Sequence, residues 1–117
     1  MSGVIELAHG GGGRLSRRLI EEEIIPRFGN ETLADLPDAA SIQVNGPKII
    51  YSTDSFVVQP LFFPGGNIGE LAVYGTANDI AVSGGKIRFL SVGLILEEGL
   101  PLETLRKVLD SLAQAAT

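Results

Sequence analysis

Apolar residues recur along this chain with two periodicities, one typical of helices and one typical of strands. Three segments repeat apolar residues at spacings of three and four and are predicted to be helices: 14–28, 68–83 and 102–116. Three others alternate or run apolar over a short length and are predicted to be strands: 42–44, 49–58 and 87–98. Segment 59–67, rich in proline and glycine, is predicted to be a loop. This order predicts an α+β fold, with a small mixed sheet covered by helices on one face.

The predicted strand 87–98 is apolar on both faces. One face carries Leu90, Val92, Leu94 and Leu96, and the other carries Ile87, Phe89, Gly93 and Ile95. A strand of this kind is covered on both sides in a folded protein. Helices of the same chain can cover one side, so we expect the other side to meet a second sheet, supplied by the second subunit of a homodimer.

Composition narrows the functional classes. The 117 residues are expected to form a single domain, 1–117, with 44% hydrophobic residues and a net charge of −5. No basic cluster exceeds Arg14, Arg17 and Arg18, which argues against binding to nucleic acid or to an anionic membrane. The absence of cysteine excludes thiolate chemistry within these residues. No apolar run is long enough to cross a membrane and no signal-peptide pattern is present, so we expect a cytoplasmic protein.

Asp79 occurs in unusual surroundings for a carboxylate. At about 100° per residue, it shares a helical stripe with the small or apolar residues Ile68, Ala72 and Gly75. The solvent-like stripe of the same helix carries Glu70, Tyr74 and Asn78. An isolated charge on an apolar stripe is costly unless it is neutralised, hydrogen-bonded or bound to a cation. Asp79 is therefore a candidate metal ligand.

Two further carboxylates complete a candidate magnesium set: Asp38, Asp54 and Asp79. Magnesium prefers hard oxygen ligands and is commonly held by a few carboxylates together with phosphate oxygens and water. Thr53 and Asn78 are the neighbours expected to orient this site. Other roles remain open: Asp38 as a turn residue, Asp54 as a strand-end cap, and Asp79 as an ion-pair partner of Lys86 or Arg88.

A glycine run precedes the first predicted helix and comprises His9, Gly10, Gly11, Gly12 and Gly13, followed by Arg14. Consecutive backbone N–H groups ahead of a helix can bind phosphate. The run matches neither the P-loop nor the dinucleotide fingerprint, and a mobile linker is the alternative. Arg14 adds either a phosphate contact or a solvated charge. With the aspartates, the run favours a magnesium–nucleotide site, whereas Glu21, Glu22 and Glu23 are predicted to form a solvated helix face.

Six segments carry a resemblance to a known family: 8–15 (Ala-His-Gly-Gly-Gly-Gly-Arg-Leu), 37–40 (Pro-Asp-Ala-Ala), 53–58 (Thr-Asp-Ser-Phe-Val-Val), 60–69, 75–81 (Gly-Thr-Ala-Asn-Asp-Ile-Ala) and 95–99. They resemble the PurM-like superfamily of ATP-dependent enzymes, named after aminoimidazole-ribonucleotide synthetase. Within it, they are most similar to the carbamoyl dehydratases of hydrogenase maturation. The resemblance covers nearly the whole chain, and segment 53–69 is its most specific part.

The resemblance implies a fold, a cofactor and partners. It implies that the sheets of two N-terminal domains close into a barrel, and that ATP and magnesium bind between an N-terminal and a C-terminal domain, with aspartates placed like Asp38, Asp54 and Asp79. It further implies ATP-dependent dehydration of a cysteine-bound carboxamide to a thiocyanate, the source of the cyanide ligands of nickel–iron hydrogenase. The implied partners are a carbamoyltransferase and other hydrogenase maturation proteins.

This sequence also departs from the family pattern. It has no cysteine and stops at Thr117, where the resemblance implies that a second domain begins. We therefore expect an N-terminal half that holds no catalytic residue and is inactive alone. Another superfamily member, such as thiamine-monophosphate kinase, and a non-catalytic dimerisation module remain alternatives. The kinase would usually pair two aspartates where this chain has Pro37-Asp38.

Overall fold

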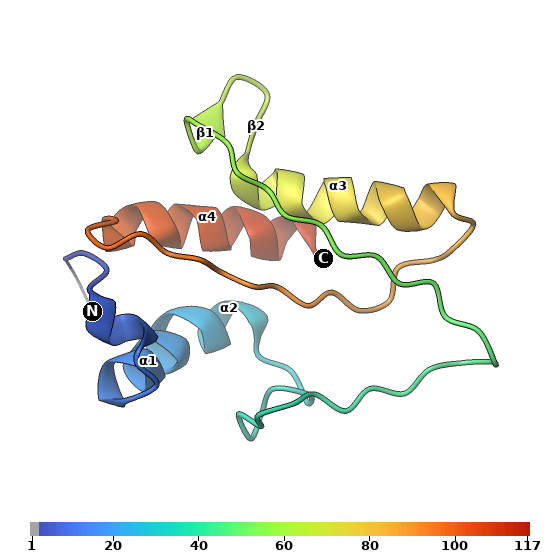
Figure 1. Cartoon of the computed structure of the whole chain (residues 1–117), viewed down its shortest axis with the longest axis horizontal. Helices are drawn as coiled ribbons and strands as arrows, with labels where there is room; N and C mark the ends of the chain where they lie inside the picture. The colour runs from blue at the N-terminus through green and yellow to red at the C-terminus, as the bar shows by residue number, and fades with distance from the viewer. Residues whose placement is uncertain (1–2) are drawn as a thin grey trace. The chain divides into compact units, whose positions relative to one another are not determined.

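The computed structural model describes residues 3–117, and Figure 1 shows the order of their elements. The helices are α1 (Arg14–Leu19), α2 (Ile25–Phe28), α3 (Ile68–Val82) and α4 (Leu102–Ala115), with a 3-10 turn at Leu7–Gly10 and a π-helical segment at Ile20–Ile24. The strands β1 (Phe62–Phe63) and β2 (Gly66–Asn67) form a two-stranded antiparallel sheet. The predicted α+β class is confirmed.

The chain divides into two compact units. Unit 1 comprises Met1–Ile42 and Leu94–Leu109, and unit 2 comprises Gln43–Gly93 and Asp110–Thr117. The expectation of a single domain over residues 1–117 stays a prediction.

Unit 1 is held by an apolar core on α4. Its buried members are Ile5, Leu19, Leu102, Leu105 and Leu109. The leucine spacing predicted this buried face, because residues three and four apart lie on one side of a helix. The N-terminal segment is fixed beside the start of α4 by backbone hydrogen bonds, from Ile5 N–H to the Leu100 carbonyl at 2.7 Å and from Gly99 N–H to the Ile5 carbonyl at 2.7 Å.

The first predicted helix is continuous through three segments. Between α1 and α2 the helix widens into the π-helical segment, where the N–H of Ile25 donates to the carbonyl of Ile20. Pro26 follows immediately and cannot donate a backbone hydrogen bond, and its ring crowds the carbonyl four residues before it. The wider turn ahead of Pro26 accommodates both effects, so the helix continues to Phe28.

Glu23 is buried, so its prediction as part of a solvated helix face was wrong. Only 6% of the residue is exposed, and both its carboxylate oxygens accept from Nε of Arg106 on α4, at 2.8 and 3.1 Å. Its backbone carbonyl also accepts a hydrogen bond from Arg27 at 2.7 Å. A buried charge is tolerated when it is paired in this way. The partner is 83 residues away in sequence, and local charge patterning gave no sign of it.

In unit 2, α3 has a defined cap at each end. The side-chain oxygen of Asn67 accepts from Glu70 N–H at 3.0 Å, and its amide group donates to Ser111 at 3.1 Å. At the other end Gly84 has φ +84°, and the N–H of Gly85 donates to the Ile80 carbonyl at 2.9 Å. This left-handed glycine ends the helix.

The predicted strands 42–44, 49–58 and 87–98 were wrong as strands. They run as irregular chain, drawn as green and orange coil in Figure 1, and the one ladder within residues 3–117 lies in the predicted loop 59–67. Across the described residues, no backbone–backbone hydrogen bond involves 37–60 or 86–96. A strand exists only through a partner strand, whereas a helix bonds to itself. The sequence pattern therefore identified segments suited to pairing but not their partners, and the barrel stays a prediction.

Candidate functional site

The glycine run is fastened to the first turn of α1. The N–H of Gly12 donates to the hydroxyl oxygen of Ser16 at 2.8 Å, and that hydroxyl donates to the carbonyl of His9 at 2.5 Å. Gly12 has φ +77°, a left-handed conformation that favours glycine. The carbonyl of Gly13 then accepts from Arg17 N–H at 3.1 Å, which begins the helix.

A hollow in unit 1 lies beside this run. Its lining residues are Gly12, Gly13, Arg14, Ser16, Arg17, Ile20 and Leu36. The predicted glycine run thus lines this hollow together with Leu36, which lies two residues before the predicted metal ligand Asp38. Leu36 has φ +49°, which is uncommon for a residue with a side chain.

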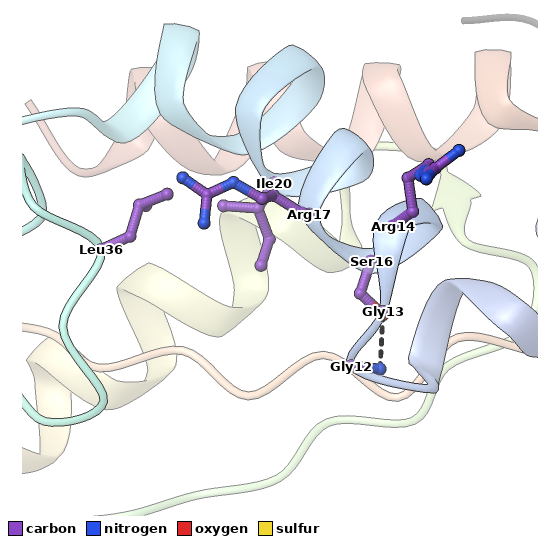
Figure 2. Close-up of a pocket in the computed structure, with 7 residues that line it drawn as sticks. All are labelled: Gly12, Gly13, Arg14, Ser16, Arg17, Ile20 and Leu36. Atoms are coloured by element: carbon purple, nitrogen blue, oxygen red, sulfur yellow. Dashed lines mark hydrogen bonds between the residues drawn. The ribbon is translucent and has the colours of Figure 1, made fainter.

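The two arginines of the hollow differ in direction. Figure 2 shows that Arg17 extends toward Leu36, whereas Arg14 extends away from it. Arg17 is held by Glu21 through a hydrogen bond of 2.8 Å. Arg14 was predicted to be either a phosphate contact or a solvated charge, and Arg17 was named only as part of a small basic cluster. Its position one turn after Gly13 was the available signal, because residues three and four apart share a helix face.

His9 points inward. The residue is 7% exposed, its Nδ1 accepts from Glu6 N–H at 2.8 Å, and within residues 3–117 its buried Nε2 has no hydrogen-bond partner. Since Nδ1 is an acceptor here, neutral His9 carries its proton on Nε2. His9 is not among the residues lining the hollow. Its contact with a nucleotide stays a prediction.

The segment that carries Asp54 lies along α3. A Cβ atom added to Gly75 would lie 2.8 Å from Cζ of Phe56, and one added to Gly85 would lie 2.9 Å from Cδ1 of Ile50. Ile50 thus lies near the end of α3 and Phe56 lies near its middle. Asp54 is between them in sequence, and Asp79 is between Gly75 and Gly85. The two carboxylates therefore belong to facing stretches of unit 2.

Asp79 is half-buried, in agreement with its predicted place on the small, apolar stripe of α3. Within residues 3–117 it forms no ion pair with Lys86 or Arg88, the alternative that the sequence left open. Asp54 is exposed, and its carboxylate accepts from Ser55 N–H at 2.9 Å. Thr53 and Asn78 are exposed beside these two residues in sequence.

Asp38, the third candidate ligand, is exposed and belongs to unit 1. In the described part of the chain, no group of three or more His, Cys, Asp or Glu side chains is arranged to hold a metal ion. The segments that contain Asp54 and Asp79 lie beside each other, and the role of both residues as metal ligands stays a prediction. The role of Asp38 stays a prediction.

Two ion pairs in unit 1 each shift the pKa of one of their members. The hydrogen bond from Arg106 to Glu23 raises the pKa of Arg106 above its ordinary value, which keeps this arginine charged. A hydrogen bond from Arg18, at 3.0 Å, lowers the pKa of Glu22. Both effects favour the charged forms of the paired groups.

The chain belongs to the family described as AIR synthase related protein, N-terminal domain, whose model matches residues 37–117. Carbamoyl dehydratase HypE of Escherichia coli (strain K12) is 51% identical over 117 residues, which cover 96% of this chain and 35% of that protein. Carbamoyl dehydratase HypE of Azotobacter vinelandii is 45% identical over 115 residues, which cover 98% of this chain and 34% of the relative.

Solved structures agree with this assignment. A hydrogenase maturation protein HypE in complex with ATP superposes with a TM-score of 0.90 at 49% identity, covering 95% of this chain and 33% of that one. HypE of E. coli superposes with a TM-score of 0.80 at 50% identity, covering 86% and 33%. The PurM-like fold and the resemblance to carbamoyl dehydratases are confirmed. The chain spans about a third of the length of the relatives it matches. Within residues 3–117, no helix is long and apolar enough to cross a membrane.

Proposed function

We propose that this chain is the ATP- and magnesium-binding, dimer-forming part of a HypE-like carbamoyl dehydratase. Such an enzyme uses ATP to phosphorylate the amide oxygen of a cysteine-bound carboxamide, and loss of phosphate leaves a thiocyanate for the cyanide ligands of nickel–iron hydrogenase. The cysteine comes from outside these residues, which contain none. A carbamoyltransferase and other hydrogenase maturation proteins are the proposed partners, and the cytoplasm is the proposed compartment.

The observation that carries this proposal is the run of the Asp54 segment along α3. The segment that contains Asp54 lies beside the stretch of helix that contains Asp79. Asp79 is half-buried on a stripe that includes Gly75, where a carboxylate needs compensation. The similar HypE structure that was solved with ATP supports nucleotide as the ligand.

The donor set fits magnesium. Asp54 and Asp79 offer hard anionic oxygens, which magnesium binds together with phosphate oxygens and water, and Asp38 is the proposed third ligand. Bound magnesium would neutralise charge on the phosphate oxygens of ATP. Thr53 and Asn78 are proposed to orient the site, and the run from His9 to Gly13 with Arg14 is proposed to bind the phosphates.

Dimerisation is proposed from the extended segments. Val57 is 94% exposed and Ile95 is 102% exposed, and the backbone of both segments lacks partners within the described chain. Unpaired apolar strands associate readily with other strands. A second copy of this chain, joined through these segments into a closed barrel, would cover them.

The test uses Asp54→Asn and Asp79→Asn in the complete product of the gene that encodes this chain. Each change removes an anionic ligand and keeps the side-chain shape. Mutation of a residue that only hydrogen-bonds to a metal ligand lowers metal affinity or activity about 10–100-fold. Loss of a ligand itself should therefore lower magnesium-dependent ATP turnover at least about tenfold. Asp35→Asn, at an exposed position of unit 1, is the matched control and should leave turnover unchanged.

The same variants separate the competing functions. If Asp79→Asn lowers the melting temperature but leaves turnover normal, Asp79 is structural and the magnesium assignment fails. Carboxamide and thiamine monophosphate, offered in parallel, distinguish a dehydratase from the kinase alternative. A non-catalytic dimerisation module would turn over neither substrate. The 117-residue chain alone is expected to hydrolyse no ATP above background.

A further inference from the structure

Ser16 uses one hydroxyl group to hold both ends of a short loop. Its oxygen accepts from Gly12 N–H at 2.8 Å, the bond drawn in Figure 2, and its proton is donated to the carbonyl of His9 at 2.5 Å. Segment 9–12 lies between these two partners. The hydroxyl therefore closes this part of the glycine run and fixes it to the first turn of α1.

His9 gives this closure an anchored end. Its backbone N–H donates to the Glu6 carbonyl at 3.0 Å, and its Nδ1 accepts from Glu6 N–H at 2.8 Å. The imidazole is buried, so water has little access to the ring. Through Ser16, the backbone of Gly12 is thus connected to a residue that is itself held by two hydrogen bonds to Glu6.

The closure also decides which loop amides remain for a ligand. The N–H of Gly11 donates to the Ala8 carbonyl at 3.2 Å and that of Gly12 donates to Ser16. The N–H of Gly13, a residue lining the hollow, has no acceptor within residues 3–117. The Gly13 N–H is therefore free to bind an anionic oxygen.

We propose that Ser16 is a positioning residue, which holds the glycine run so that the Gly13 N–H is ready for a phosphate oxygen of ATP. This inference rests on the proposed function, because it assumes that ATP is the ligand. Without the hydroxyl, the run would have to be ordered when the ligand binds, and glycine loses the most backbone freedom on ordering. Folding itself should change little, since the Gly12 bond is solvent-exposed and water can replace it.

The test compares Ser16→Ala, which removes the hydroxyl, with Ser16→Thr, which keeps it. Ser83→Ala, at an exposed position after α3, is the control. Calorimetry on the complete gene product measures affinity for magnesium-ATP and for adenosine. A net hydrogen bond is worth about fivefold in an equilibrium constant, so Ser16→Ala should weaken ATP binding about fivefold and leave adenosine binding unchanged. Ser16→Thr and Ser83→Ala should bind both ligands normally.

A second measurement tests the hydrogen bonds of Ser16 in the absence of nucleotide. Amide exchange of Gly12, followed by NMR, should be faster in Ser16→Ala than in wild type and normal in Ser16→Thr. Unchanged exchange overturns the inference, as does an equal loss of ATP and adenosine affinity, which marks a structural role. If wild type binds ATP and Ser16→Ala binds it equally well, only the inference fails. If wild type binds no ATP, the proposed function fails and the inference fails with it.

Discussion

The two units of this chain differ in how far their apolar residues are buried. In unit 1 the apolar residues of α4 are covered by the N-terminal segment and α1, and Leu102 and Leu109 are each 1% exposed. In unit 2, Tyr51 and Val57 stand in extended chain at 76% and 94% exposure. The difference follows from the elements involved. A helix satisfies its own backbone and needs only an apolar partner face, whereas an extended segment also needs a partner for its backbone.

The strongest test of this comparison removes one side chain from each unit. Leu105→Ala leaves a cavity in the core of unit 1, and a buried leucine truncated in this way costs about 2–5 kcal/mol of unfolding free energy. Val57→Ala, its counterpart in unit 2, should cost less than about 0.5 kcal/mol in the monomer, at protein concentrations too low for association, as for other surface changes. Urea denaturation of the two variants measures both values. Equal losses in the monomer would mean that Val57 is covered within its own chain and that the comparison is wrong.

Gly75→Ala tests the packing inside unit 2. The added Cβ would lie 2.8 Å from Cζ of Phe56, and overpacking costs about 1–3 kcal/mol. Alanine also favours a helix over glycine by about 1 kcal/mol, so we expect a net loss of about 1 kcal/mol in thermal unfolding. The double variant Phe56→Leu with Gly75→Ala should recover most of it. A stabilised Gly75→Ala would show that Phe56 does not rest on α3, which would remove the support for placing Asp54 beside the Asp79 helix.

Phe89→Asp should have the smallest effect on folding and a clear effect on association. Phe89 is half-exposed in an extended segment whose backbone has no partner within the described residues, so a charge there hinders pairing with a second copy. Sedimentation at micromolar concentration should show a dimer for wild type and a monomer for the variant. Ser83→Asp adds the same charge at an exposed position after α3, outside this extended segment, and controls for charge alone. A wild-type chain that stays monomeric and soluble would refute the dimer.

Parts of the candidate site could be predicted from sequence because their motifs are local. The glycine run was recognised, and Asp79 was correctly placed on the half-buried stripe of α3. Ser16 and Leu36 were missed. The role of Ser16 depends on one hydrogen bond to each end of the run, and Leu36 reaches the hollow through the path of a loop. Neither feature can be inferred from sequence spacing, because both depend on the path of the folded backbone.

The sequence by itself determined the helices and the family. The ends of α3 and α4 were predicted to within one residue, and the leucine spacing of α4 identified its buried face. Helical hydrogen bonds join residues that are close in sequence, so the local sequence determines their pattern. Tertiary structure alone decided the burial of Glu23 against Arg106, the run of the Asp54 segment along α3, and the absence of a ladder in the extended segments of the described chain. Each of these depends on a partner far away in sequence, which local periodicity cannot specify.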